Sequence, residues 1–163
     1  MSKITRRNFI KTSALSAIFL SSVPQAVKSM ASPFWDDYDE VICKKKFKLL
    51  IDGDVKSMSI GDAIAEVGKS FIDTDYVAGT LDKNMSESLV VNLTGLDCVT
   101  FVENCLVFAR CIKQGKTSFD DYKAELKKVR YRDGKIDGYS SRLHYFCDWI
   151  TNNEDKGIVK NIT

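Results

Sequence analysis

The chain has 163 residues, with 24 Lys and Arg against 22 Asp and Glu, and a formal net charge of +2. No basic face interleaved with aromatic side chains occurs, which argues against nucleic acid as a partner. The five cysteines lack paired Cys-x-x-Cys units and there is a single histidine, which rules out most zinc ligand sets. We therefore expect one domain with no metal and no other cofactor.

The first 31 residues have the features of an export signal peptide. Arg6 and Arg7 precede an apolar run over residues 14–23, and a small-x-small cleavage site ends at residue 31. The arginine pair matches the twin-arginine pattern, which implies the twin-arginine export machinery as a partner and a periplasmic location. An ordinary secretory signal with coincidental arginines is the alternative. The apolar run falls short of the roughly 20 residues of a membrane span, so we expect no stable span.

Removal of this segment changes the electrostatics of the chain. The segment carries five basic and no acidic residues, so the net charge of the remaining 32–163 domain is −3 rather than +2. The basic balance of the whole chain therefore comes from the predicted signal.

Two amphipathic helices are predicted next. The first runs from Asp36 to about Leu50, with the basic run of residues 43–48 on its solvated side. The second is predicted over residues 59–71, with Ser59 as N-cap and apolar residues at helical spacing. A turn-rich stretch follows, in which residues 88–93 (SLVVNL) are the best strand candidate.

Helical spacing dominates the second half of the chain. The predicted helices begin near Asp97, at Ser118 and within residues 140–153, with a loop or tight hairpin at 131–139. Gly157 is expected to end the last helix, and the residues after it resemble the beginning of a strand. The pattern predicts a mostly helical α+β fold. Either its sheet is very small or most of the sheet is missing from this chain, and we prefer the second interpretation.

Cys98 directly follows Asp97 in the predicted first turn of a helix. It belongs to the apolar stripe of that helix, so one interpretation is a buried thiol. The other is a nucleophile, because the unpaired N–H groups and the positive end of the helix dipole favour the thiolate and can stabilise an oxyanion. The remaining cysteines are predicted to be structural, the last three because they lie in mid or late helical turns: Cys43, Cys105, Cys111 and Cys147.

Three stretches together resemble a known family. YVAGTL at 76–81, followed by LDCVTFVE at 96–103, is similar to the signature of the papain-like cell-wall hydrolases of the NlpC type. YRDG at 131–134 and SRLHYFCDWI at 141–150 narrow the resemblance to the branch described as N-acetylmuramoyl-L-alanine amidase-like. The resemblance extends from about Ile60 to the C-terminus.

The resemblance implies a papain-like (NlpC-type) fold, of which this chain is the N-terminal, mostly helical part. It implies cleavage of the amide between muramic acid and L-alanine in anhydro-muropeptides, so peptidoglycan fragments are the expected partner. Cys98 would be the nucleophile, forming an acyl-enzyme without a metal, and Tyr76 would hydrogen-bond near the scissile group. In the family the general-base histidine follows the final helix on a strand, and we expect this chain to stop before that strand.

Four further residues are candidates for substrate binding. His144 is expected to line the cleft rather than to act as the base. Arg142 suits the carboxylates of a stem peptide and Trp149 suits a sugar face, whereas a solvated arginine and a tryptophan packed at the helix edge are the alternatives. Asp97 is expected to cap its helix or to touch the substrate.

The sequence thus predicts an exported, cysteine-dependent N-acetylmuramoyl-L-alanine amidase. One alternative is a stem-peptide endopeptidase of the same superfamily. The other is an inactive truncated copy that at most binds muropeptides. The YRDG and RLHYF stretches favour the amidase, and the apparent lack of the histidine strand favours the inactive copy.

Overall fold

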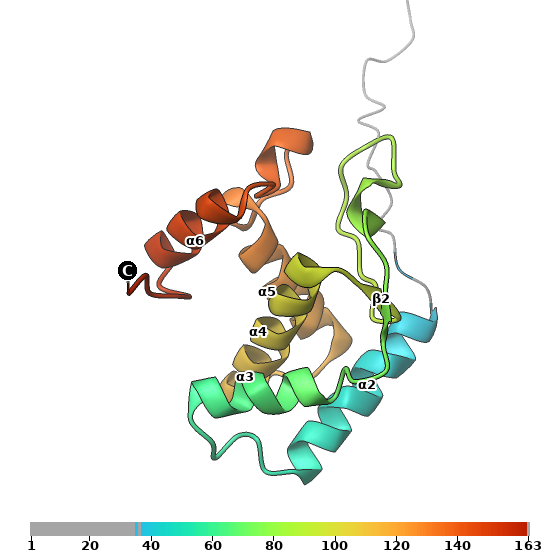
Figure 1. Cartoon of the computed structure of the whole chain (residues 1–163), viewed down its shortest axis with the longest axis vertical. Coiled ribbons are helices and arrows are strands. Elements are labelled where there is room, and N and C mark those ends of the chain that lie inside the picture. The colour runs from blue at the N-terminus through green and yellow to red at the C-terminus, as the bar shows by residue number, and fades with distance from the viewer. Residues whose placement is uncertain (1–34, 36, 163) are drawn as a thin grey trace, which may run out of the picture. The chain divides into compact units, whose positions relative to one another are not determined.

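The computed structural model describes residues 35 and 37–162 (Figure 1). The α-helices are α2 (Asp37–Asp52), α3 (Ile60–Lys69), α4 (Cys98–Gln114), α5 (Phe119–Arg130) and α6 (Phe146–Asp155). The short elements are the strands β1 (Asp75–Tyr76) and β2 (Gly95–Leu96) and the 3-10 helices η1 (Thr80–Asp82), η2 (Arg132–Gly134) and η3 (Tyr139–Ser141). No helix in the described part is long and apolar enough to cross a bilayer. The predicted export signal lies outside the described residues.

The predicted N-caps are present immediately before the first residues of α3 and α5. The Ser59 hydroxyl accepts the N–H of Asp62 at 3.2 Å, and the Ser118 hydroxyl accepts the N–H of Asp121 at 3.0 Å. Each serine therefore satisfies one of the backbone donors that a helix N-terminus leaves unpaired. The expected starts of these two helices are confirmed.

α4 lies at the centre of the helices, with α2, α3 and α5 packed around it (Figure 1). The fully buried Phe108 of α4 joins them: its ring centroid is 4.9 Å from that of Phe47 in α2 and 4.8 Å from that of Tyr122 in α5. Phe71, just after α3, contacts the same ring at 6.2 Å. Edge and tilted aromatic contacts of this kind add to the burial of apolar area that stabilises the core.

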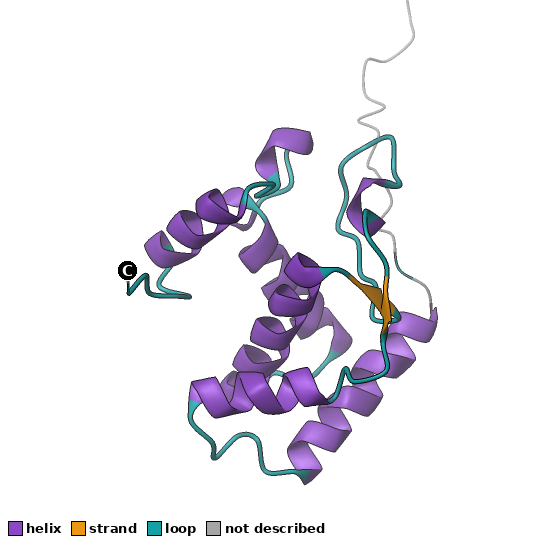
Figure 2. Ribbon diagram, viewed as in Figure 1, coloured by secondary structure: helices purple, strands orange, loops and turns teal. Residues whose placement is uncertain are grey.

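The described residues contain one two-stranded sheet, which is consistent with an α+β fold. β1 and β2 are parallel, with Asp75 opposite Gly95 and Tyr76 opposite Leu96, and Figure 2 shows them beside the start of α4. A Cβ at Gly95 would lie 2.6 Å from Cγ2 of Val77, so only glycine permits this close approach. The pairing brings Tyr76 close to the residues that lead into α4.

The prediction of a strand at residues 88–93 is wrong, because no regular strand forms there. The segment is largely buried, but side chains from helices take up its backbone groups. Arg130 donates from Nη1 to the carbonyl of Val90 at 2.6 Å, and the N–H of Leu93 donates to Oδ1 of Asp39 at 2.8 Å. Backbone groups that are already satisfied in this way need no neighbouring strand.

The last helix begins later than expected, at Phe146 instead of near residue 140. Residues 139–141 form η3, and Arg142 then pairs with Tyr131 in an antiparallel bridge. The next N–H, of Leu143, donates to the carbonyl of Arg130 at 3.0 Å. These contacts hold the chain extended where the sequence pattern predicts a helix.

The delayed start changes which residues of α6 face inward. Trp149 and Asn153 are its buried residues, whereas Phe146 and Cys147 are exposed. Gly157 ends the helix as expected, with a φ of +66° and its N–H donating to the carbonyl of Glu154. The prediction that a strand begins after Gly157 is wrong for the described residues, which extend to 162.

Candidate active site

Cys98 is the first residue of α4, and its side chain is exposed. The expectation that it lies on the buried face of the helix is therefore wrong. Asp97 is the N-cap, as expected: its Oδ1 accepts the N–H of Thr100 at 2.8 Å, and the Thr100 hydroxyl accepts the N–H of Asp97 at 2.9 Å. This reciprocal capping box holds the turn that presents the thiol.

A cavity of about 290 Å³, here called the Cys98 pocket, opens at this turn. Its lining residues come from the loop after α3, from β1 and β2, and from the N-cap and first turn of α4: Phe71, Thr74, Tyr76, Leu96, Asp97, Cys98 and Phe101. The structure thus brings together Cys98, Tyr76 and Asp97 from the residues that the sequence indicates. The apolar wall was not foreseen, although Phe101, one helical turn after Cys98, could have been inferred from spacing alone.

The first turn of α4 also supplies backbone donors. Asp97 occupies the N–H of Thr100, and the N–H groups of Cys98 and Val99 have no hydrogen-bond acceptor among the described residues. Such groups at a helix N-terminus carry partial positive charge. Next to a reactive thiol they can stabilise negative charge on a carbonyl oxygen.

A second cavity of about 160 Å³, here called the polar pocket, shares Asp97 with the Cys98 pocket. Its titratable lining residues combine both signs of charge: Asp82, Asp97, Glu103, Arg130, Arg142 and His144. Sequence reasoning missed Asp82, Glu103 and Arg130, since nothing in their local pattern distinguishes them from other surface charges.

The floor of the polar pocket is a buried ion pair. Nε of Arg130 lies 2.8 Å from Oε2 of Glu103, and the two side chains are 3% and 2% exposed. Burial lowers the pKa of Arg130, but the Glu103 carboxylate outweighs it, and the pKa is raised above its ordinary value. Arg130 therefore keeps its charge in the interior.

Arg142 is buried, so the alternative interpretation of a solvated arginine is wrong. It forms a hydrogen-bonded ion pair with Asp82, and its Nε lies 3.3 Å from Oε1 of Glu87 without hydrogen-bond alignment. Glu87 also accepts a hydrogen bond from Tyr131 at 2.7 Å. The carboxylates around Arg142 in this structure are therefore those of the protein itself.

His144 lies in the loop between η3 and α6, and its side chain is exposed. Its ring packs at a tilt of 30° against Tyr139 with centroids 3.9 Å apart, and Nε2 is 2.7 Å from the carbonyl oxygen of the same residue. It lines the polar pocket but not the Cys98 pocket. The single histidine of the chain therefore lines the same cavity as Asp97 but not the cavity of the thiol.

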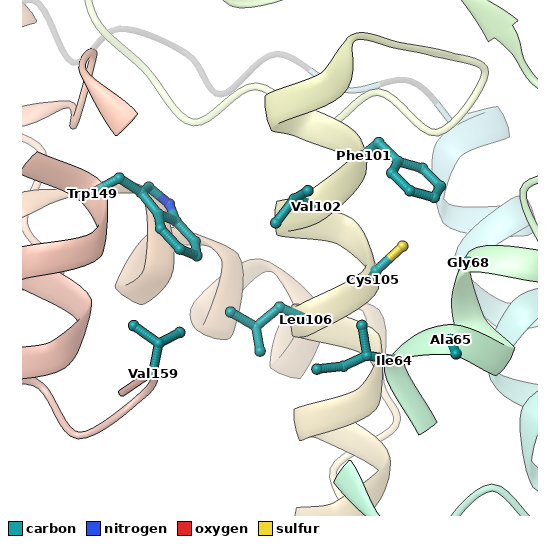
Figure 3. Close-up of a pocket in the computed structure, with 9 residues that line it drawn as sticks. All are labelled: Ile64, Ala65, Gly68, Phe101, Val102, Cys105, Leu106, Trp149 and Val159. Carbon is teal, nitrogen blue, oxygen red and sulfur yellow. The ribbon is translucent and has the colours of Figure 1, made fainter. Parts of the chain in front are cut away.

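Trp149 lines a different cavity, an apolar groove of about 480 Å³ (Figure 3). Its indole lies across the groove from Val102 and Leu106 of α4, and its Nε1 has no hydrogen-bond partner among the described residues. It stacks on Phe146 at 5.4 Å and is 4% exposed, so it packs against the core as the alternative interpretation has it. It does not line the Cys98 pocket.

A comparison with models of known protein families identifies a family for this chain. Residues 66–163 match the model of the AmiA-like family, described as N-acetylmuramoyl-L-alanine amidase-like. No curated protein matches the chain.

Three solved structures illustrate the likeness. An N-acetylmuramoyl-L-alanine amidase from Bacteroides uniformis is 43% identical, with a TM-score of 0.57, over 60% of this chain and 41% of its own. A protein from Bacteroides fragilis, described as a candidate xylanase, is 47% identical, with a TM-score of 0.54, over 58% and 41%. A Legionella pneumophila protein is 26% identical, with a TM-score of 0.58, over 73% and 39%. The chain spans about two fifths of the length of these structures.

Proposed function

Because this chain belongs to the N-acetylmuramoyl-L-alanine amidase-like family, we propose that it carries the nucleophile and part of the substrate cleft of a cell-wall hydrolase. The proposed reaction is hydrolysis of the amide that joins muramic acid to L-alanine in peptidoglycan fragments, including anhydro-muropeptides. The observation that carries the proposal is the exposed thiol of Cys98 at the first residue of α4, in a cavity that also contains Tyr76 and Asp97. The fold that we propose is of the papain-like NlpC type.

In this mechanism the Cys98 thiolate attacks the carbonyl carbon of the muramoyl lactyl group. The N–H groups of Cys98 and Val99 stabilise the oxyanion that forms, and Tyr76 hydrogen-bonds near the scissile amide. The alanine amine takes a proton and leaves, which produces a thioester. Water then attacks the thioester, releases the muramoyl carboxylate and restores the thiol. No metal has a role in any of these steps.

The proton shuttle needs a base within hydrogen-bond reach of the thiol and of the leaving amine. No histidine lines the Cys98 pocket of the described residues. We therefore propose that the base is a group that the described lining of this pocket does not include.

A second candidate function is binding of muropeptides without turnover. The observation that favours it is the same lack of a histidine in the Cys98 pocket of the described residues. Proposed export through the twin-arginine machinery to the periplasm would bring either form of the protein to peptidoglycan. An endopeptidase acting within the stem peptide is a further proposal, distinguished from the amidase by the bond that is cut.

The test is hydrolysis of an anhydro-muropeptide by the protein isolated from its native cells. Cys98→Ala should lower kcat by at least about 10³-fold, because it removes the nucleophile. Cys147→Ala is the matched control: that thiol is also exposed and also lies in the first turn of a helix, but it lines neither pocket. Mass spectrometry of the products identifies the bond that is cut.

Activity that survives Cys98→Ala would overturn the proposed nucleophile. Cleavage of xylan by both variants would support the chemistry suggested by the Bacteroides fragilis relative, since glycosidases use a pair of carboxylates instead of a thiol. Binding without hydrolysis in the wild type would favour the second candidate function.

A further inference from the structure

Resting on the function proposed above, we infer that the polar pocket binds the sugar half of the substrate, and that the Cys98 pocket receives the alanine side. Asp97, the residue before Cys98, lines both cavities, and Val99, the residue after it, lines the polar pocket. A substrate whose scissile amide lies at Cys98 thus has one cavity available for each of its two halves.

The polar pocket offers hydrogen-bond donors and acceptors side by side. Its floor consists of Glu103, Arg130 and Arg142, whose side chains are no more than 6% exposed and are held by ion pairs. Its rim carries Asp82, with a side chain 62% exposed, and the exposed His144. Groups that are already fixed by internal contacts lose little conformational entropy when a ligand binds.

This charge pattern disfavours the carboxylate of a stem peptide. The lining holds three carboxylates, from Asp82, Asp97 and Glu103, and the two guanidinium groups are already paired with Asp82 and Glu103. An incoming carboxylate would meet like charges without a free counter-ion. Sugar hydroxyl and acetamido groups both donate and accept hydrogen bonds, so they can pair with acid and guanidinium groups at once.

The Cys98 pocket has the opposite character. Phe71, Leu96 and Phe101 form an apolar wall there, which suits the methyl group of an alanine residue. In the proposed substrate the lactyl group joins the sugar ring to the scissile amide, and in the protein Asp97 lines both cavities.

The experiment compares two probes that share the alanine end. The full chain carrying Cys98→Ala, which cannot turn over, is titrated with N-acetylmuramoyl-L-alanine and with N-acetyl-L-alanine. Affinities are measured by calorimetry and the contacts by amide and methyl chemical shifts. We expect the muramoyl probe to bind at least tenfold more tightly, with shifts at Leu143 and His144 that the acetyl probe does not produce.

Variants at the rim then test the assignment. His144→Ala and Asp82→Asn should each weaken the muramoyl probe about fivefold, the equivalent of one lost hydrogen bond, and leave the acetyl probe unchanged. Tyr145→Ala is the matched control, because it removes a neighbouring exposed aromatic ring that lines neither pocket. Thermal unfolding of each variant confirms that the fold is retained.

Three outcomes would overturn the inference: equal affinity for the two probes, muramoyl-specific shifts at Phe71 and Phe101 instead of Leu143 and His144, or no effect of either rim variant. Each leaves the proposed function to be judged separately, because Cys98-dependent hydrolysis is measured on the native protein. If hydrolysis proves independent of Cys98 while sugar binding is intact, the proposed function is overturned and the sugar subsite is retained.

Discussion

Asp97 and Thr100 exchange hydrogen bonds across the first turn of α4, at 2.8 Å and 2.9 Å. The pair closes the helix end on one side and leaves the thiol of Cys98 exposed on the other. The same aspartate contributes to both the Cys98 pocket and the polar pocket, so one residue links helix stability with the geometry of the site.

The first prediction concerns this cap. Asp97→Ala should lower the free energy of unfolding by about 1 kcal/mol, because the N–H of Thr100 loses its acceptor. Asp97→Asn keeps a side-chain oxygen and should cost much less. Urea unfolding followed by circular dichroism measures both. Equal stability of the two variants would show that the cap contributes nothing.

The second prediction concerns the reactivity of the cysteines. Cys98 and Cys147 are exposed, whereas Cys43, Cys105 and Cys111 are buried. Burial raises the pKa of all three buried thiols, that of Cys105 to about 11 and that of Cys111 to about 12, which lowers their thiolate fraction at neutral pH.

Iodoacetamide should therefore modify the two exposed thiols of the folded chain first and the other three only after unfolding. Peptide mass mapping over time measures the order. The matched comparison is Cys98 with Cys147, since both lie in first turns: a faster rate at Cys98 would point to a contribution from its pocket. Modification of Cys105 at the rate of Cys98 would contradict the buried position of Cys105.

The third prediction concerns the buried ion pair. Arg130→Met leaves the Glu103 carboxylate in the interior without its counter-ion, which should cost about 3–5 kcal/mol of stability. It also removes the hydrogen bond to the carbonyl of Val90. The double variant Glu103→Leu and Arg130→Met should recover part of the loss. If the double variant loses more free energy of unfolding than the two single variants lose together, the argument from an unpaired charge is wrong.

The fourth prediction concerns pH. The folded pKa values of Cys105 and Cys111 lie above the ordinary value of 9.0, so the thiols are more easily ionised in the unfolded chain. Their contribution to stability is thus complete below about pH 9 and is lost as the pH rises towards 11 and 12. Under reducing conditions, urea midpoints should fall above pH 9, and the fall should be smaller in Cys111→Ala.

Lys46 acts in the opposite sense over part of this range. Burial lowers the pKa of Lys46 to about 8, so its protonation opposes folding below that pH, and the opposition is relieved as the pH rises towards 10.5. Lys46→Met should therefore steepen the alkaline fall. An unchanged pH profile in both variants would mean that neither burial effect governs stability.

The fifth prediction concerns export. Replacement of both Arg6 and Arg7 by lysine should leave the protein in the cytoplasm, because the twin-arginine machinery recognises the arginine pair. Cell fractionation and the size of the processed chain measure this. Substitution of Lys3 and Lys11 by arginine provides a control that keeps the positive charge. Normal export of the double lysine variant would indicate the ordinary secretory route.

The sequence by itself determined where α3, α4 and α5 begin. Ser59, Asp97 and Ser118 each bond an N–H three residues further along the chain, so every partner lies within one turn. Contacts this short are independent of the rest of the fold, which is why the pattern predicts them. The resemblance to the amidase-like family rests on equally local stretches, and the family match confirms it.

Only the tertiary structure decided how the remaining residues are used. Arg142 pairs with Asp82, which lies 60 residues earlier, and residues 88–93 lose their strand to side chains 40 and 54 residues away. Cys98 belongs to an apolar stripe, yet it is exposed because that stripe extends past the packed core into an open cavity. Helical spacing indicates which residues share a face, but whether that face is covered depends on segments distant in the chain, and this no local pattern contains.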